Sequence, residues 1–408
     1  MFPTGIFEKK RVLVGITGGI AAYKACEIIR YLVTYGAEVR AMMTDGATKF
    51  ITELTIETLT NHPVYTNMFP QKFAATHHIE AADWAEMGVI VPATANIVGK
   101  LANGIGDDFV STTLLAMHCP TVIAPAMNNH MWFHPAMQRN IALLRDWGYL
   151  ICNPEEGFLA EGYSGMGRLA RPEFITQFLY RAAHPQPESL RGKTVLITAG
   201  RTEEMLDPVR MFTNRSTGKM GFALAWEAFA RGATVILVHG PAQLTPPVGI
   251  TSIAVRSAQE MLEAVEKHID AADIYISAAA IADYRPKKIF DQKIKKQDGD
   301  FAVEMDRTVD VLKTMGGKKQ AHQQFVGFAV ETDQPEKNAR NKLKNKNLDL
   351  VVLNNPNESG AAFAGDTNVV TIIGKNDSAK IAQQYKLDVS RAIFDALIAQ
   401  KKGEGSDE

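Results

Sequence analysis

The feature that most constrains the fold of this chain is a repeated order of short apolar strand, glycine-rich turn and helix. The run "VLVGI" at 12–16 precedes the turn 17–19, and apolar residues then recur at helical spacing over 20–32. The same order starts again with "TVLITAG" at 194–200 and a helical run over 218–233. Short apolar strands separated by helices predict mostly parallel sheets, since parallel strands need a crossover connection. We therefore expect an α/β protein.

The length and a linker predict two domains. The 408 residues are too many for one ordinary core, and the segment "HPQPESLRGK" at 184–193 is rich in proline and polar residues. The two halves show no close sequence repeat. We expect two different doubly wound domains with mostly parallel sheets, a flavodoxin-like domain over 1–190 and a Rossmann-like domain over 191–408.

Further elements follow from the same periodicities. Additional strands are expected at "EVRAMM", "GVIVPA", "TVIAPA" and "YLIC" in the first half, and at "TVILVHG", "DIYISAAA", "LDLVVLN" and "TNVVTIIG" in the second. Additional helices are expected over 46–55, 95–117, 131–147, 257–269 and 378–400, with another after residue 334.

The bulk composition is that of a soluble globular protein and fits a reducing cytoplasm. The net charge is −1, which excludes general attraction to nucleic acid or to an anionic membrane. The three cysteines, Cys26, Cys119 and Cys152, have no CxxC spacing, so neither a disulfide framework nor a thiolate zinc site is expected. We find no signal-peptide pattern and no run of about 18 apolar residues that would span a membrane.

Three segments of the first half can form a ligand site. The glycines of "GITGGIAAYK" at 15–24 lie between a strand and a helix, where backbone N–H groups suit a phosphate. The spacing is not GxGxxG, so a mononucleotide phosphate and a ligand-free turn both stay open. "PATAN" at 92–96 and "PAMNNHMW" at 125–132 follow strands. They either end those strands or line the carboxyl edge of the sheet, where such folds bind ligands.

The segments "GGIAAYK", "HIE" with "DWA", "PATAN", "PAMNNHMW" and "GMGR", in this order, resemble the flavin-dependent cysteine decarboxylases, above all those acting on phosphopantothenoylcysteine. The resemblance covers residues 10–182. It implies that FMN is bound and that His78, not its neighbour His77, is the active-site histidine, while Asn128 orients the substrate. It further implies a set of FMN-binding residues: Gly18, Gly19, Ile20, Ala21, Thr44, Thr94, Ala95 and Asn96.

The glycine-rich stretch "LAEGYSGMGR" at 159–168 is expected to be a lid over the substrate. The implied chemistry oxidises the cysteinyl CH–SH group, releases CO₂, and then needs a proton donor to reduce the resulting enethiol. Many relatives have a cysteine in this role where this chain has Glu161. Either Glu161 or Tyr163 supplies the proton, or another group does so while Glu161 faces solvent, or the reaction stops at the enethiol. A closed lid that desolvates Glu161 would raise its pKa.

The second half contains groups suited to a polyphosphate. The sequence "NRSTGKMG" at 214–221 is not a Walker A motif, but Ser216, Thr217 and Gly218 open a helix that can bind phosphate. Basic residues crowd 285–296 and recur over 337–346. Such runs are either solvated faces or phosphate-binding surfaces.

Residues 191–400 resemble the phosphopantothenate–cysteine ligases through "NRSTGKMG", "AAAIADYRP", "KIKK", "VGFAVET" and "NKNLDL". The resemblance implies CTP as co-substrate, Mg²⁺ and an acyl-cytidylate intermediate. Asn214 would act on this intermediate and Lys293 would be catalytic, with Arg210 near the substrate and Asp283 near the nucleotide or its Mg²⁺. Further implied nucleotide contacts are Ser277, Ala278, Ala279, Thr308, Val309, Asp310, Val311, Phe328, Lys342 and Lys346. Relatives often read "NPDI" where this chain reads "TVDV" at 308–311, so Asp310 alone rests on the match.

A decarboxylase followed by a linker and a ligase is the order of a bacterial bifunctional family of coenzyme A biosynthesis. Two alternatives are a flavoprotein that decarboxylates a peptidyl cysteine and a non-enzymatic flavin-binding regulator. The ligase-like half argues against the first alternative, and the presence of Asn214 and Lys293 argues against the second. The resemblance also implies a homo-oligomer, a dodecamer built from trimers with shared decarboxylase sites and from ligase dimers.

Overall fold

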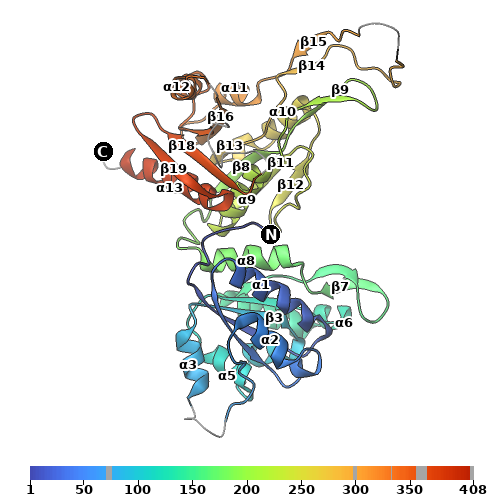
Figure 1. The fold of residues 1–408 in the computed structure, drawn as a ribbon, viewed down its shortest axis with the longest axis vertical. Coiled ribbons are helices and arrows are strands. Elements are labelled where there is room, and N and C mark those ends of the chain that lie inside the picture. The colour runs from blue at the N-terminus through green and yellow to red at the C-terminus, as the bar shows by residue number, and fades with distance from the viewer. Residues whose placement is uncertain (70–75, 297–300, 332, 355–364, 405–408) are drawn as a thin grey trace. The chain divides into compact units, whose positions relative to one another are not determined.

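The computed structural model describes residues 1–69, 76–296, 301–331, 333–354 and 365–404 (Figure 1). Contacts divide the chain into two compact units: unit 1 consists of Met1 and Gly5–Pro185, and unit 2 of Phe2–Thr4 and Gln186–Glu408. Within the described residues, no helix is both long and apolar enough to cross a membrane.

Unit 1 is built on a five-stranded parallel sheet with the strand order β2-β1-β3-β4-β5. Its strands are β1 (Arg11–Ile16), β2 (Glu38–Met43), β3 (Met87–Ala93), β4 (Thr121–Pro125) and β5 (Leu150–Ile151). The central strand β3 is buried along its whole length, as expected of a strand covered by helices on both faces. The order reverses between β1 and β3, which is where open α/β sheets bind ligands. The flavodoxin-like fold expected for this half is confirmed.

Helices cover both faces of this sheet. One face carries α1 (Ala25–Thr34) and α8 (Pro172–Ala183), and the other carries α3 (His77–Trp84), α4 (Ala95–Ala102), α5 (Phe109–Ala116), α6 (Asn129–Phe133) and α7 (Pro135–Asp146). The helix expected over 46–55 is wrong. Residues 47–49 form only a short 3-10 turn, and the α-helix α2 (Glu53–Thr60) begins only at Glu53. Its N-cap is Thr52, whose hydroxyl accepts a hydrogen bond from the Thr55 N–H at 3.4 Å.

Unit 2 contains an eight-stranded mixed sheet with the order β12-β11-β8-β13-β16-β17-β18-β19. The strands are β8 (Thr194–Ala199), β11 (Thr234–His239), β12 (Thr251–Ala254), β13 (Ile274–Ser277), β16 (Gln324–Val330), β17 (Leu350–Asn354), β18 (Thr367–Ile373) and β19 (Ser378–Tyr385). The first six strands in this order are parallel, as in a Rossmann fold, and the last two add antiparallel. The doubly wound, mostly parallel fold expected here is confirmed.

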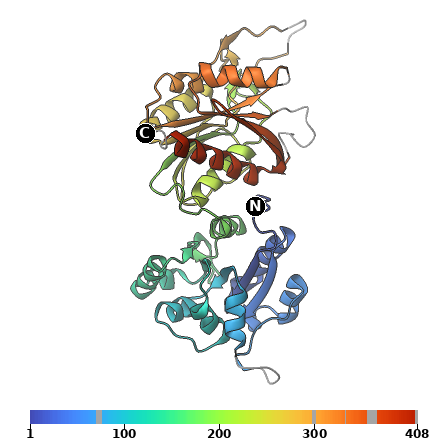
Figure 2. The ribbon, with the colours of Figure 1, turned by 90° about the vertical axis from the view of Figure 1, so that its left-hand side faces the viewer.

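The helices of unit 2 also form two layers. Helices α9 (Lys219–Ala230) and α13 (Lys386–Glu404) pack together on one face, while α10 (Ala258–Glu266), α11 (Val311–Gly316) and α12 (Pro335–Asn345) cover the other. Figure 2 shows the orange α12 and the red α13 on opposite sides of the sheet.

The last helix begins later than the sequence indicated. Residues 378–385 form strand β19, so the expectation of a helix over 378–400 is wrong for its first eight positions. The alanine, lysine and glutamine of this segment favour a helix, but backbone pairing with β18, for example Thr371 opposite Lys380, overrides that preference. Strands β12 and β16 were not anticipated as strands.

Two antiparallel pairs extend from unit 2 beyond its sheet. Strand β9 (Glu203–Met205) pairs with β10 (Met211–Thr213), and β14 (Tyr284–Pro286) pairs with β15 (Met305–Arg307). Figure 1 shows the β14–β15 pair projecting as an arm. Three residues expected to act in the ligase lie in or beside these pairs. Arg210 and Asn214 flank β10, and Lys293 lies between β14 and β15.

Candidate active sites

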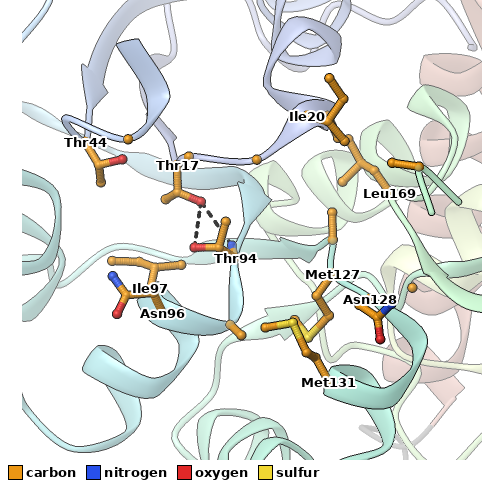
Figure 3. Close-up of a pocket in the computed structure, with 18 of the residues that line it drawn as sticks. Thr17, Ile20, Thr44, Thr94, Asn96, Ile97, Met127, Asn128, Met131 and Leu169 are labelled. Atoms are coloured by element: carbon orange, nitrogen blue, oxygen red, sulfur yellow. Dashed lines mark hydrogen bonds between the residues drawn. The ribbon is translucent and has the colours of Figure 1, made fainter. Parts of the chain in front are cut away.

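A cavity of about 990 Å³ opens at the carboxyl edge of the unit 1 sheet, around the point where the strand order reverses (Figure 3). All eight residues expected to bind the flavin line this cavity: Gly18, Gly19, Ile20, Ala21, Thr44, Thr94, Ala95 and Asn96. Asn128 and Glu161 line it as well. The structure therefore brings together segments that are far apart in the sequence.

Hydrogen bonds from Thr17 join the two strand ends that form the inner wall of the cavity. The Thr17 hydroxyl donates to the Pro92 carbonyl at 2.7 Å and accepts from the Thr94 N–H at 3.0 Å. Figure 3 shows Thr17 and Thr94 facing each other. A Cβ atom on Gly18 would lie 2.7 Å from the carbonyl carbon of Gly46, so only glycine allows this close approach. The exposed backbone beyond Gly18 leads into a helical turn at Ile20, whose first N–H groups have no intrahelical acceptors.

Asn128 is held at the start of α6 and points its amide at the lid. Its Oδ1 atom accepts from the His130 N–H at 2.8 Å, which caps the helix. Its Nδ2 atom donates to Glu161 Oε1 at 2.9 Å and to Tyr163 Oη at 2.7 Å. The hydrogen bond from Asn128 is the main cause that lowers the pKa of Glu161. Glu161 is exposed, so desolvation raises its pKa by less than the hydrogen bonds lower it.

The lid is a hairpin of β6 (Glu155–Phe158) and β7 (Ser164–Arg168) that is anchored at its base. The Met127 N–H donates to the Gly167 carbonyl at 3.0 Å, and the Asn129 side chain accepts from the Met166 N–H at 3.0 Å. Gly167 has a φ of +138°, and a Cβ there would collide with the Met127 carbonyl oxygen. This contact fixes the hairpin, and Phe158–Glu161 of its outer part line the cavity.

His78 does not line this cavity. It lies on α3, which packs against α5, and its Nδ1 atom is buried without a hydrogen-bond partner among the described residues. Within one chain, the structure therefore does not bring His78 to Asn128.

Several cavity residues were missed from the sequence. Met127 and Met131 lie beside Asn128 in Figure 3 and belong to the quoted "PAMNNHMW" motif, so their position next to Asn128 was the available signal. Lys100 also lines the cavity and contacts Asp107 at 2.5 Å and Asp108 at 2.6 Å. Burial acts to lower the pKa of Lys100, but these two carboxylates outweigh it and raise that pKa.

A second cavity, of about 450 Å³, lies in unit 2 at the carboxyl ends of β13 and β16. The expected nucleotide contacts that line it are Ser277, Ala279, Asp283, Thr308, Val309, Asp310, Val311, Phe328, Lys342 and Lys346. Ala278 does not line it. The segment 308–311 lines the cavity even though its sequence departs from that of relatives.

Two lysines line this cavity together with Arg307. Lys342 Nζ donates to the Phe328 carbonyl at 2.6 Å, and burial, followed by the nearby charge of Lys346, lowers its pKa. Lys346 Nζ lies 2.8 Å from Asp310 Oδ2. Burial acts to raise the pKa of Asp310, but the bonds from Lys346 and the Lys313 N–H outweigh it and lower that pKa. Asp310 thus pairs with Lys346, whereas Lys342 Nζ is bonded to a neutral carbonyl. The charge of Lys342 can therefore attract an anion.

Arg210, Asn214 and Lys293 lie outside the walls of this cavity. Asn214 is near its rim, because its Nδ2 atom donates to the carbonyl of Ile281, a lining residue, at 3.0 Å. Arg210 donates to the Ile294 carbonyl at 3.2 Å, while Lys293 is exposed. The described residues contain no group of three or more His, Cys, Asp or Glu side chains that could hold a metal. Asp283 and Asp310 are the two carboxylates that line the cavity.

Comparisons with known proteins agree with this division into two sites. The flavoprotein family model matches residues 4–184, and the model of the DNA/pantothenate metabolism flavoprotein C-terminal domain matches residues 190–400. The chain is 49% identical over 404 residues to the coenzyme A biosynthesis bifunctional protein CoaBC of Bacillus subtilis (strain 168), covering 98% of this chain and 99% of that protein. It is 41% identical over 398 residues to the CoaBC of Vibrio cholerae (serotype O1, strain ATCC 39315 / El Tor Inaba N16961), covering 96% and 98%.

Two solved structures resemble separate parts of the chain. The C-terminal domain of a coenzyme A biosynthesis bifunctional protein CoaBC is 40% identical, with 53% of this chain and 99% of that chain covered and a TM-score of 0.46. The FMN-dependent cysteine decarboxylase SpaF is 35% identical, with 42% and 99% covered and a TM-score of 0.38.

The fold and the two cavities define a two-unit α/β enzyme with a flavoprotein half. The chain belongs to the family of bifunctional coenzyme A biosynthesis proteins. It carries a phosphopantothenoylcysteine decarboxylase and a phosphopantothenate–cysteine ligase. The two alternatives raised from the sequence do not account for a match that extends over both halves.

Proposed function

We propose that residues 1–190 form an FMN-dependent phosphopantothenoylcysteine decarboxylase and that residues 191–408 form a CTP- and Mg²⁺-dependent phosphopantothenate–cysteine ligase. The observation that carries the first assignment is the cavity of unit 1, which joins the phosphate-type turn at Gly18–Ala21 to the amide of Asn128. The second assignment is supported by the lysine-bearing cavity at the strand ends of unit 2.

The residues of the first cavity fit a flavin mononucleotide. The turn at Gly18–Ala21 offers backbone N–H groups to a phosphate, and Thr44 and Thr94–Asn96 line the same cavity. Its volume of about 990 Å³ is at the upper end of the range typical of small-molecule sites, so it has room for a second ligand. When bound there, FMN supplies the two-electron redox chemistry of the reaction.

Asn128 is proposed to hold the substrate carboxylate. An amide N–H can bind a carboxylate without adding charge, so the carboxylate can leave as neutral CO₂ without breaking an ion pair. His78 is proposed to move a proton in the same reaction. Because His78 lies outside the cavity of its own unit, we place it in the cavity of a neighbouring copy within a trimer.

The second cavity is proposed to bind CTP. Ser277, Ala279 and Phe328 would contact the nucleoside, while Lys342 and Lys346 would bind its phosphates. Asp283 would share a Mg²⁺ ion with those phosphates, since Mg²⁺ is commonly held by one or two carboxylates together with substrate phosphates. Asn214 at the cavity rim would contact the acyl-cytidylate, and Arg210 would bind phosphopantothenate.

Lys293 is proposed to stabilise negative charge at the α-phosphorus of CTP. It is exposed and does not line the cavity, so we place it in the ligase site of a second copy. Exposed apolar side chains on the same projecting segments, among them Val209, Tyr284 and Ile289, fit such an interface. Trimers of unit 1 and dimers of unit 2 would together give a cytoplasmic dodecamer.

The test is to incubate the purified full chain with phosphopantothenate, cysteine, CTP and Mg²⁺, and to follow the products by mass. We expect a yellow protein that releases pyrophosphate and CO₂ and forms 4′-phosphopantetheine. Pyrophosphate release that does not depend on phosphopantothenate and cysteine would contradict the ligase assignment. Failure to release CO₂ from phosphopantothenoylcysteine would contradict the decarboxylase assignment.

A further inference from the structure

The amide of Asn128 has both of its N–H groups occupied by the tip of the lid. Its Oδ1 atom accepts from the His130 N–H, which sets the orientation of the amide and directs Nδ2 toward the lid. The two N–H groups then go to Glu161 Oε1 and Tyr163 Oη. An amide has only two N–H donors, so a substrate carboxylate can bind Asn128 only when one of these acceptors leaves.

Glu161 is the acceptor that a substrate carboxylate would replace. Both are carboxylates that accept the same N–H, and Glu161 is exposed and able to turn into solvent. Tyr163 is held more firmly, because its backbone carbonyl accepts from the Leu159 N–H at 2.9 Å. With Glu161 displaced, one N–H would bind the substrate and the other would keep Tyr163. The carbon that carries the carboxylate would then lie next to the Tyr163 hydroxyl.

The two lid side chains differ in whether they can give up a proton. The bond from Asn128 lowers the pKa of Glu161, so this carboxyl is ionised near neutral pH and has no proton to donate. The phenol of Tyr163, by contrast, carries an O–H group that can act as a donor. The Tyr163 oxygen accepts from Asn128, which leaves its O–H free to donate, and no hydrogen bond from it occurs among the described residues. The same Asn128 N–H would stabilise the phenolate that forms when the proton leaves.

We propose that Tyr163 is the proton donor of the decarboxylase, and that it protonates the carbon from which CO₂ has departed. This inference rests on the proposed FMN-dependent decarboxylation. The C–COO⁻ bond breaks and leaves its electron pair on the enethiolate. The Tyr163 O–H bond breaks as a C–H bond forms, which gives a thioaldehyde. Bound FMN would supply a hydride to the C=S carbon, which returns the two electrons lost when the thiol was oxidised, and protons from solvent would restore the thiol and Tyr163.

The test uses the full chain, FMN and phosphopantothenoylcysteine with Tyr163→Phe, which removes the hydroxyl and keeps the ring. We expect CO₂ release in the first turnover to continue, while formation of the saturated thiol falls by about 10²-fold or more. The product should be two hydrogens lighter than phosphopantetheine, and the flavin should stay reduced and lose its yellow colour. A purely structural role would instead lower flavin content and CO₂ release together.

Glu161→Gln is the matched variant, because its amide oxygen still accepts from Asn128 but it carries no charge and no acid. We expect its product to be the saturated thiol, with no accumulation of the lighter species. Wild-type output from Tyr163→Phe would overturn the proposal, and so would accumulation of the lighter product by Glu161→Gln. If the wild-type chain itself releases no CO₂, the proposed decarboxylase function fails, which is a different result from a failure of the tyrosine assignment.

Discussion

Asn128 combines a structural contact and a proposed substrate contact in one side chain. Its Oδ1 atom caps α6, and its Nδ2 atom faces the lid. An aspartate at this position would keep the helix cap, since a carboxylate also accepts from the His130 N–H. It would lose both N–H donors and place a negative charge against Glu161 and the substrate carboxylate.

We therefore expect Asn128→Asp to bind FMN as the wild type does but to lose CO₂ release by at least about 10²-fold, because a like charge opposes the substrate. Flavin absorbance per subunit and CO₂ release measure the two effects separately. Loss of the flavin would show that Asn128 supports FMN binding instead.

Lys293 and Asn214 should affect different halves of the ligase reaction. Lys293→Gln removes the charge proposed to stabilise the α-phosphorus, so formation of the acyl-cytidylate and pyrophosphate should be abolished. Asn214→Asp should still release pyrophosphate and slow the attack of cysteine. Pyrophosphate release and amide formation are measured in parallel. Wild-type pyrophosphate release by Lys293→Gln would contradict its role.

The lowered pKa of Lys342 predicts a pH dependence of CTP binding. As the pH rises through this lowered pKa, Lys342 loses its charge and its attraction for phosphate. The KM for CTP should therefore rise at a lower pH than ordinary lysines would cause. Lys342→Arg keeps its charge and should shift that rise to higher pH. Lys318→Arg, an exposed control, should leave the profile unchanged. Identical profiles for all three proteins would exclude Lys342.

At the scale of elements, the β6–β7 hairpin depends on one glycine at its base. Gly167 combines a positive φ with a collision between any Cβ and the Met127 carbonyl, whereas Gly162 has a φ of +89° and open space around it. Alanine substitutions at these two glycines therefore distinguish the cost of backbone strain alone from the cost of strain together with a steric collision.

Gly162→Ala should cost about 1 kcal/mol of unit 1 stability through strain alone, and Gly167→Ala about 2–3 kcal/mol or more. Thermal unfolding followed by flavin release measures both. We also expect Gly167→Ala to weaken substrate binding, because its hairpin must move away from Asn128. Equal losses of stability in the two variants would show that the Met127 carbonyl moves away from the new Cβ at no energetic cost.

At the scale of the whole molecule, the N-terminal segment belongs to unit 2, although unit 1 follows it directly in the sequence. Phe2–Thr4 groups with unit 2, where the Thr4 hydroxyl donates to Asp388 at 2.9 Å and the Phe2 ring lies 5.2 Å from that of Trp226. A fragment that starts at residue 191 lacks these contacts.

We expect fragment 1–190 to form trimers that bind FMN and fragment 191–408 to form dimers, while the full chain forms dodecamers; native mass spectrometry measures each state. Fragment 191–408 should also melt below unit 2 of the full chain, because it lacks Phe2–Thr4. Adding residues 1–10 as a free peptide serves as a control. If a monomeric full chain showed both activities, it would contradict the proposal that His78 and Lys293 act in the active sites of neighbouring copies.

The sequence by itself determined the α/β class, the two halves and the segments that meet at the carboxyl edge of the first sheet. Strand and helix periodicities are local, and residues at the carboxyl ends of parallel strands must meet at one edge of a sheet. The resemblance to the flavin-dependent cysteine decarboxylases implied the individual residues from Gly18 to Asn96, and these residues line one cavity.

Only the tertiary structure decided the contacts that depend on long-range pairing. Residues 378–385 became a strand because β18 offered unpaired backbone groups at its edge, which outweighed a local helical preference. Asn128 met Glu161 and Tyr163, 33 and 35 residues later, because Gly167 lets the hairpin pack against Met127. His78 lies outside the cavity because α3 packs on α5. Such placements follow from packing between distant segments, and no local pattern of residues encodes them.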